Sequence, residues 1–236
     1  MTSLYQAVIF DAGGTLIGQD DPLGFERQLA AAFADLGVSA TAEEIRSLMP
    51  KLRKGARKRR ERTGGWSRTA DEEKRSVLWV ASFLLENLGV LEDVEAKAAA
   101  IFERFAAGEF ISLFSDVKPT LESLQRRGIT MGVLSNYAPF LERNLGLLGI
   151  HHYFAFFVVS SLVGFEKPDP RIFRLAMKKA GYPPKEILYV GDSIADDVEG
   201  AQRVGLGVIL LDRFDRFPEA HCERIASLAE LLQLFS

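Results

Sequence analysis

Short apolar runs recur along the chain and alternate with longer segments of helical pattern. Five such runs, mostly rich in β-branched and aromatic residues, occupy residues 4–10, 129–134, 154–159, 187–190 and 207–211. They lack the polar–apolar alternation of half-exposed strands, which is typical of strands that are buried on both faces of a parallel sheet. We therefore expect these runs to be the strands of one parallel sheet.

The segments between these runs carry the start and stop signals of helices. Three of them begin with proline and are followed directly by glycine: residues 119–127, 139–148 and 170–180. Proline near the start and glycine just past the end is the usual asymmetry of a helix. Strands that alternate with helices predict right-handed βαβ units, and hence an α/β fold with a Rossmann-like, doubly wound parallel sheet.

The stretch from about Asp20 to Gly108 interrupts this alternation. It contains no convincing strand and reads as four helices, over residues 23–36, 42–62, 70–88 and 94–107. A helical block inserted after the first strand predicts a second, smaller unit above the sheet. We expect a core of residues 1–16 and about 113–236, with an inserted α-helical domain over about 17–112.

Composition narrows the class of protein. The 236 residues have a formal net charge of −3, with 47% apolar and 26% charged residues, so the chain shows no bias toward nucleic acid or a membrane surface. The single cysteine, Cys222, excludes an internal disulfide and a cysteine-based zinc site. Neither a signal-peptide pattern nor an apolar run of membrane-spanning length is present. We expect a cytoplasmic protein without nucleic-acid or membrane partners.

Polar side chains follow the predicted strands at the points where the strands end. The residues in question are Asp11, then Ser135 and Asn136, then Lys167, and finally Asp192, Asp196 and Asp197. Ligands of open α/β sheets bind outside the carboxyl ends of the strands, so these groups are expected to converge. Carboxylates suit Mg²⁺, whereas lysine and backbone amides suit phosphate. The pattern predicts a joint site for a divalent cation and a phosphate.

Four segments resemble, in order and spacing, the motifs of the haloacid dehalogenase-like hydrolase superfamily: FDAGGTL, LSN, EKPDP and VGDSIADD. The helical insert after the first segment resembles the C1-type cap of subfamily I. Four ordered motifs across nearly the whole chain are a strong signal, although each alone is weak. The resemblance implies a hydrolase that binds Mg²⁺ and acts on a small, anionic, phosphorylated substrate.

The resemblance also implies a role for each matching residue. Asp11 matches the nucleophile that forms an aspartyl-phosphate, and Lys167 matches the catalytic lysine that holds the phosphate and shields Asp11. Further substrate contacts match Ala12, Gly13, Gly14, Ser135 and Asn136. The Mg²⁺ ligands match Asp11, Asp192 and the backbone carbonyl of Gly13. Supporting positions around the site match Thr15, Asp196 and Asp197.

Gly13 departs from the family's pattern, because the phosphatases of the family carry an aspartate there that protonates the leaving group and later activates water. General acid–base help is worth ~10²–10⁴-fold in rate. One interpretation is a slow phosphatase that favours good leaving groups, such as acyl or aryl phosphates, or takes its proton from the cap or the substrate. Another is a catalytically weak protein that binds phosphate and metal in a regulatory role.

A third interpretation is phosphonate or carbon–halogen cleavage, because two branches of the superfamily also lack this acid. The phosphonatases use a lysine of the cap as a Schiff base, and the candidates here are Lys51, Lys54, Lys58 and Lys74. The basic run over residues 51–62 surrounds its predicted helix. It indicates a solvated helix face, or a positive surface that draws an anionic substrate toward the site.

Overall fold

The computed structural model describes residues 4–235 and contains a six-stranded sheet in which every pairing is parallel, with strand order β3-β2-β1-β4-β5-β6. The strands are β1 (Ala7–Phe10), β2 (Thr130–Ser135), β3 (Phe156–Val159), β4 (Ile187–Gly191), β5 (Gly207–Leu211) and β6 (Arg224–Ile225). The predicted parallel sheet is confirmed. The two-residue β6 was not predicted, because so short a strand leaves no pattern in the sequence.

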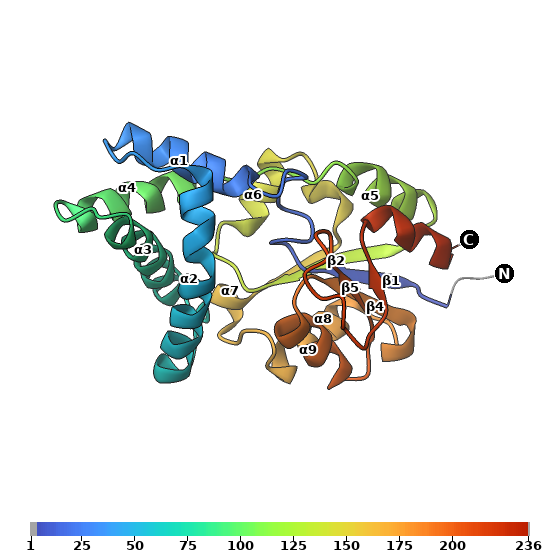
Figure 1. Ribbon diagram of the computed structural model, residues 1–236. Coiled ribbons are helices and arrows are strands. Elements are labelled where there is room, and N and C mark those ends of the chain that lie inside the picture. Colours follow the sequence, from blue (N-terminus) through green and yellow to red (C-terminus); the bar gives the residue numbers. More distant parts are fainter. Residues whose placement is uncertain (1–3, 236) are drawn as a thin grey trace.

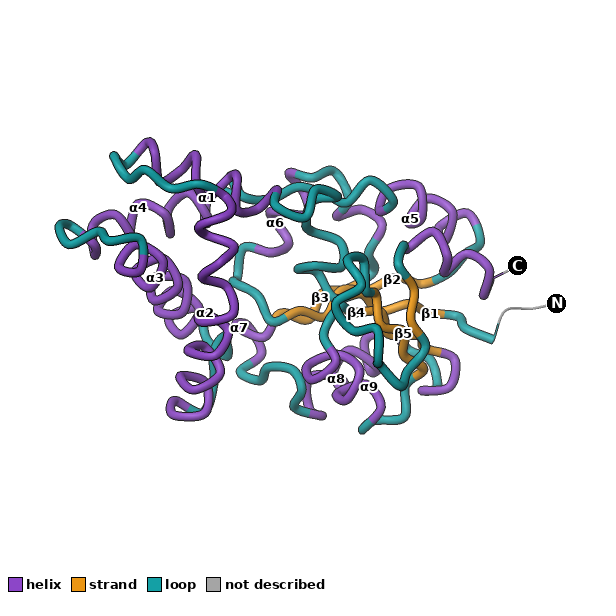
Figure 2. The backbone as a smooth tube through the Cα atoms, viewed as in Figure 1, coloured by secondary structure: helices purple, strands orange, loops and turns teal. Residues whose placement is uncertain are grey.

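Helices cover both faces of the sheet (Figures 1 and 2), as a doubly wound fold requires. One face packs against α5 (Val117–Arg126), α6 (Leu141–Leu147) and the 3₁₀ segment η4 (Leu228–Phe235), and the other against α8 (Pro170–Ala180) and α9 (Glu199–Gln202). Successive residues of β1 alternate between these two apolar clusters, Val8 and Phe10 in one and Ala7 and Ile9 in the other. This burial on both faces explains the unbroken apolar runs of the sequence.

The predicted helices of the sheet unit differ from the structure mainly at their starts. Helix α8 has the predicted bounds, whereas α5 begins two residues before Pro119, because proline is tolerated in the first turn of a helix. Helix α6 begins at Leu141 rather than at Pro139. Short elements that were not predicted complete the unit: η1 (His151–Tyr153), α7 (Ser160–Val163), η2 (Pro184–Glu186) and the π-helical turn η3 (Ile194–Val198).

Four helices lie between β1 and α5 and form what we call the helical unit, beside the sheet in Figure 1. They are α1 (Gly24–Asp35), α2 (Ala42–Thr63), α3 (Ala70–Asn87) and α4 (Val94–Ala107). Their apolar faces form a separate cluster that draws only on residues 29–110. Side chains of Thr41 and Thr69 cap the starts of α2 and α3. No helix among residues 4–235 is long and apolar enough to cross a membrane.

The segments that enter and leave the helical unit run side by side. Ile17 bridges Leu113 in antiparallel fashion, and the amide of Gly18 donates to the carbonyl of Ser112 at 2.8 Å. The Ser112 hydroxyl returns a hydrogen bond to the carbonyl of Gly18 at 3.1 Å. This double connection joins the helical unit to the loop that follows β1.

Candidate active site

The strand order brings the predicted polar residues to one edge of the sheet. β1 lies between β2 and β4, so Asp11, Ser135 and Asp192 follow or end three neighbouring strands. The hydroxyl of Ser135 donates to Asp11 Oδ1 at 3.0 Å, and Lys167 Nζ donates to the same oxygen at 2.7 Å. Asp11, Ser135 and Lys167 are all buried. The expected convergence of these side chains is therefore present.

Lys167 is held among three oxygens. Besides Asp11, its ammonium group donates to Asp197 Oδ1 at 2.5 Å and to the hydroxyl of Tyr189 at 3.1 Å, and that hydroxyl donates to Asp197 Oδ1 at 2.8 Å. Burial opposes the charge on Lys167, but the carboxylates of Asp11 and Asp197 outweigh it and raise the pKa of Lys167 above its ordinary value. Lys167 is thus a permanent cation at neutral pH.

The two adjacent acids of the fourth motif point to different partners. Asp197 is buried, and its Oδ2 accepts from the amide of Ser193 at 3.0 Å. Asp196 accepts instead from Arg60 of the helical unit, at 3.0 Å to Oδ1. The π-helical turn η3 carries both residues, and π-helical turns are frequent at functional sites. The turn directs Asp197 toward Lys167 and Asp196 toward Arg60. The spacing of the two acids in the sequence does not decide which of them faces Lys167.

Asp11, Asp192 and Asp197 form a compact carboxylate cluster, with one oxygen atom of each within 4.8 Å of the others. Burial raises the pKa of Asp11 to about 7. The charge of Lys167 lowers this pKa, whereas the charges of Asp197 and Asp192 raise it further. The three carboxylates face two cations, Lys167 and Arg216, and Arg216 pairs with Asp192 Oδ2 at 2.8 Å. The remaining negative charge suits a divalent cation with oxygen ligands. Gly14 is required here, because its φ is +78° and a Cβ would lie 2.3 Å from Asp192 Oδ2.

The loop after β1 is held by backbone hydrogen bonds. The carbonyl of Ala12 accepts from the amides of Leu16 at 2.9 Å and Ile17 at 2.7 Å. Thr15 is fully buried, and its hydroxyl has no hydrogen-bond partner among residues 4–235, but its carbonyl accepts from Arg213 at 3.0 Å. The contact by which Thr15 supports this loop is therefore made by its backbone carbonyl.

The side chain of Asn136 is held by the backbone of Lys167. Its Oδ1 accepts from the amide of Lys167 at 2.7 Å, and its Nδ2 donates to the carbonyl of Lys167 at 3.1 Å. Both polar atoms of the side chain thus contact the backbone of one residue, and the second N–H of Nδ2 remains available. Asn136 thus positions Lys167, and it also lines the pocket that holds Asp11, so the substrate contact that the family resemblance implies stays a prediction.

A contact between the two units adjoins this site. Glu166 accepts from Arg60 Nε at 2.6 Å through Oε1, and from the amides of Trp66 and Ser67 at 2.8 and 2.7 Å through Oε2. Arg60 also donates to the carbonyl of Lys167. The basic run over residues 51–62 is therefore not only a solvated face, because one of its arginines binds the edge of the site.

Two cavities meet at Gly13. The aspartate pocket, about 150 Å³, is lined by the cluster residues together with Ser135, Lys167 and Tyr137. The large cavity, about 710 Å³, lies between the helical unit and the sheet unit and shares Gly13 and Tyr137 with that pocket. A Cβ added at Gly13 would have no atom within 4 Å. Since the φ of Gly13 is not positive, glycine is not required there by the backbone.

The sequence profile of the haloacid dehalogenase-like hydrolase family matches residues 5–205. The chain belongs to this family. It is 36% identical over 135 residues to a glyceraldehyde 3-phosphate phosphatase of Methanopyrus kandleri, which is 55% of this chain and 57% of that protein. It is 37% identical over 123 residues to a phosphoserine phosphatase of Thermus thermophilus. This match covers 50% of this chain and 49% of that protein. The chain thus spans about half the length of these relatives.

Solved structures of the family share the fold over nearly the whole chain. The HAD-hydrolase YfnB of Bacillus subtilis has a TM-score of 0.79 at 21% identity, and the superposition covers 98% of this chain and 99% of that one. A 2-haloacid dehalogenase of Pseudomonas syringae has a TM-score of 0.64 at 24% identity, with 98% and 97% covered. At these identities the likeness shows the fold alone.

The four lysines considered for Schiff-base chemistry in this member of the family lie away from the site. Lys51 donates to Asn87, and Lys74 lies over the ring of Phe102 at 5.1 Å. None of the four lysines lines the aspartate pocket or the large cavity, as far as the described chain shows. This placement gives no support to a phosphonatase mechanism.

Proposed function

We propose that this protein is a Mg²⁺-dependent phosphatase that acts on a small phosphorylated molecule through an aspartyl-phosphate on Asp11. The observation that carries the proposal is the pairing of Asp11 with both Lys167 and Ser135 inside a cluster of carboxylates beside a cavity. The phosphatase names of the similar proteins support the reaction class.

Each part of the site has a task in this reaction. The hydroxyl of Ser135, the ammonium of Lys167 and the amides of Ala12 and Gly13 bind the oxygens of the phosphate. The amide of Gly14 donates to the carbonyl of Ile17 at 2.8 Å, so Gly14 contributes its close backbone approach instead. Asp11, Asp192 and the carbonyl of Gly13 would hold Mg²⁺, which neutralises charge on the phosphate when it is bound. Asp197 keeps Lys167 in place, and Asp196 links the site to Arg60.

The carboxylate of Asp11 attacks phosphorus in line with the departing oxygen, which forms an Asp11 oxygen–phosphorus bond and breaks the phosphorus–leaving-group bond. Water then attacks the same phosphorus, releases inorganic phosphate and restores Asp11. Lys167 remains charged throughout, and its charge offsets the repulsion between Asp11 and Asp197. Gly13 supplies no proton in the first step and no base in the second.

In the same proposal, residues 17–112 act as a cap that closes over the site, excludes water and selects the substrate. Contacts of Arg60, Trp66 and Ser67 with Glu166 support this role, because they dock the helical unit directly beside Lys167. The reported structure of YfnB is described as bound to magnesium and as revealing interdomain movement, which is consistent with such a role.

Acid-quench labelling tests the mechanism. Radiolabelled acetyl phosphate, a donor with a good leaving group, is mixed with the protein and Mg²⁺, and the protein is precipitated in acid. We expect label on the wild type, because hydrolysis of the phosphoenzyme lacks the base at position 13, and none on Asp11→Asn. Turnover that persists in Asp11→Asn without any label on the wild type would overturn the mechanism.

The second candidate function is a phosphate- and metal-binding regulatory protein with little turnover. Gly13 favours it, because the position that would carry the acid–base group has only a hydrogen atom. This candidate predicts that Mg²⁺ and phosphate bind without hydrolysis of any member of a broad phosphatase panel. Asp11-dependent turnover of acetyl phosphate excludes it.

A further inference from the structure

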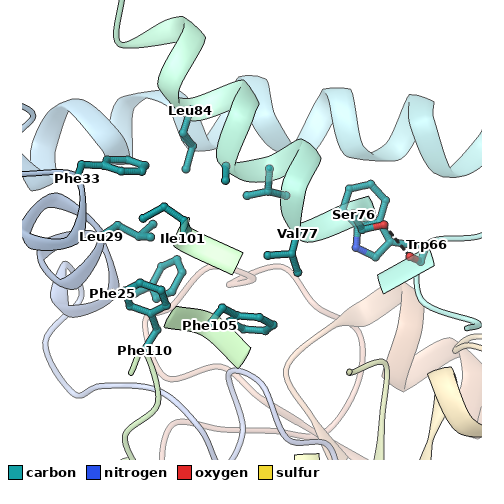
Figure 3. Close-up of a pocket in the computed structure, with 12 residues that line it drawn as sticks. Phe25, Leu29, Phe33, Trp66, Ser76, Val77, Leu84, Ile101, Phe105 and Phe110 are labelled. Carbon is teal, nitrogen blue, oxygen red and sulfur yellow. Dashed lines mark hydrogen bonds between the residues drawn. The ribbon is translucent and has the colours of Figure 1, made fainter. Parts of the chain in front are cut away.

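An apolar slot lies inside the helical unit, between its helices (Figure 3). Its volume is about 140 Å³, and its walls are aromatic and aliphatic side chains. Ser76 carries the one hydroxyl among the described lining side chains, and it donates to the carbonyl of Trp66 at 2.7 Å. Apolar cavities of roughly 150 Å³ stay dry and bind benzene. The slot therefore suits an apolar ring rather than water.

The slot adjoins the large cavity at three aromatic side chains. Phe25, Phe105 and Phe110 line both hollows, and Figure 3 shows them together along one side of the slot. The rings of Phe25 and Phe110 meet edge to face at 6.5 Å. Phe25 remains 46% exposed, so its ring is only partly packed against other side chains. A ligand in the large cavity can thus extend between these rings into the slot.

The large cavity also reaches Gly13, which it shares with the pocket that holds Asp11. A side chain at position 13 would occupy open space at this junction, since no atom lies within 4 Å of its Cβ position. Glycine therefore removes the proton donor and at the same time widens the passage from Asp11 toward the slot. The first effect changes how the leaving group is protonated, and the second changes how large a leaving group fits.

Without a donor at position 13, a leaving group that is stable as an anion departs most readily. A phenolic oxygen is stable as an anion near pH 10, as in tyrosine, which is well below the pH at which an alkyl alcohol ionises. An aromatic leaving group therefore fits the missing acid, and its ring fits the apolar slot. Two independent features of the structure, Gly13 and the slot, select the same chemistry.

We propose that the substrate is an aryl phosphate monoester whose apolar ring system lies in the slot while its phosphate lies at Asp11. This inference rests on the proposed phosphatase function. An oxygen of Asp11 bonds to phosphorus as the phosphorus–aryl oxygen bond breaks, and the electron pair leaves with the aryl oxygen. The aryloxide takes a proton from water, and a second water releases phosphate from Asp11.

Four phosphates, assayed with the full chain and Mg²⁺, test the inference on the wild type. Phenyl and 2-naphthyl phosphate have leaving groups of similar acidity but different apolar area, n-octyl phosphate has a poor leaving group, and acetyl phosphate is small with a good one. We expect kcat/KM for 2-naphthyl phosphate to exceed that for phenyl phosphate about tenfold, because one methylene in an apolar pocket is worth ~10–200-fold. Equal values for the two aryl phosphates, or a preference for n-octyl phosphate, would overturn the inference.

Ala81→Leu tests the slot itself, because Ala81 lines it and is buried on α3. We expect kcat/KM for 2-naphthyl phosphate to fall about tenfold and that for acetyl phosphate to change less than about twofold. Ala98→Leu is the matched control, since Ala98 is equally buried in the same apolar cluster but does not line the slot. Loss of both activities together, or of neither, contradicts the assignment.

The two proposals fail in different ways. If acetyl phosphate is not hydrolysed in an Asp11-dependent manner, the phosphatase function itself is wrong. If acetyl phosphate is hydrolysed but the aryl series shows no dependence on ring size, only the substrate class is wrong. If Ala81→Leu does not fold, the comparison of substrates on the wild type still decides the question.

Discussion

Arg60 of the helical unit and Glu166 of the sheet unit form an ion pair at 2.6 Å, one residue before the lysine that contacts Asp11. The side chain of Glu166 is almost fully buried, and that of Arg60 is 30% exposed. Arg60 also reaches Asp196 at 3.0 Å and the carbonyl of Lys167. One arginine thus ties α2 to two motifs of the site, and we infer that it holds the helical unit closed.

Replacing Arg60 by alanine should open the helical unit. We expect kcat/KM for acetyl phosphate to fall roughly tenfold, equivalent to about 1.4 kcal/mol, because Lys167 loses a backbone support and water enters the site. Steady-state kinetics measure the loss, and small-angle X-ray scattering measures the opening. Arg60→Lys should recover little of the lost activity. An ammonium group lacks the planar fork of a guanidinium and cannot span both carboxylates.

Arg57→Ala is the control for Arg60→Ala. Arg57 lies on the same helix, its side chain is 78% exposed, and its ion pair with Glu61 is long, at 3.6 Å. Exposed pairs of this kind contribute little, so activity and shape should both remain those of the wild type. Equal kinetics for Arg60→Ala and Arg57→Ala would mean that the Arg60 contacts do not act on the site.

Glu73 should make the stability of the protein depend on pH. Its side chain is buried on α3, its Oε2 has no hydrogen-bond partner among residues 4–235, and burial together with Glu166 raises its pKa to about 8. An unfolded glutamate ionises near pH 4.5. Between these values the folded state keeps a proton that the unfolded state releases, so stability falls as pH rises, by ~1.4 kcal/mol for each pH unit.

Urea unfolding at pH 5 and pH 8 measures this effect. Glu73→Gln removes the titrating group, so its free energy of unfolding should exceed that of the wild type at pH 8 and approach it at pH 5. Glu72→Gln is the matched control, because Glu72 is the preceding residue, pairs with Arg68 and has a lowered pKa. A wild-type curve parallel to that of Glu73→Gln would show that Glu73 is not protonated in the fold.

Mg²⁺ should raise the melting temperature of the wild type. A ligand that binds only the folded state stabilises it by about 2.7 kcal/mol at 100 times its Kd, and the repulsion within the carboxylate cluster is relieved at the same time. Asp192→Asn should abolish most of this shift, as followed by thermal denaturation over a Mg²⁺ titration. Asp169→Asn should retain the shift, because Asp169 caps α8 and pairs with Arg171 outside the cluster.

The sequence predicted the parts of the site that immediately follow strands. Asp11 and Asp192 are tied to β1 and β4, so the parallel sheet brings them together once the strands pair. Their positions depend on local pattern and on one rule of topology, and both can be read from the chain. The same reasoning located Ser135 at the end of β2.

Contacts that depend on packing between distant segments could not be predicted in this way. Arg60 lies 106 residues before Glu166, and nothing in the sequence distinguishes it from the other arginines of the basic run. Tyr189 belongs to an apolar strand, where nothing marks its hydroxyl as a partner of Lys167. Arg213 reaches the carbonyl of Thr15 across 198 residues. Each contact needs the relative placement of whole elements, which periodicity does not contain.

Gly13→Asp should convert the protein into a faster phosphatase for alkyl phosphates. The side chain enters open space, and the backbone at position 13 needs no left-handed φ, so the substitution should not strain the loop. A carboxyl group there can protonate the leaving oxygen and later activate water, for an expected gain of ~10²-fold or more with an alkyl phosphate. The leaving group of acetyl phosphate needs no proton. The rate at which acetyl phosphate labels Asp11 should therefore rise much less.

Gly13→Asn separates the acid from the mere presence of a side chain. It has nearly the same shape as aspartate but cannot donate and take back a proton in this way, so its rate with an alkyl phosphate should stay at the wild-type level. Single-turnover measurements should also show that the phosphoenzyme of Gly13→Asp decays faster than that of the wild type, since the second step regains its base. If neither rate rises in Gly13→Asp, the missing carboxylate does not limit the reaction. The obstacle would then lie in the placement of water or substrate beneath the helical unit, with Gly13 only making room for the leaving group.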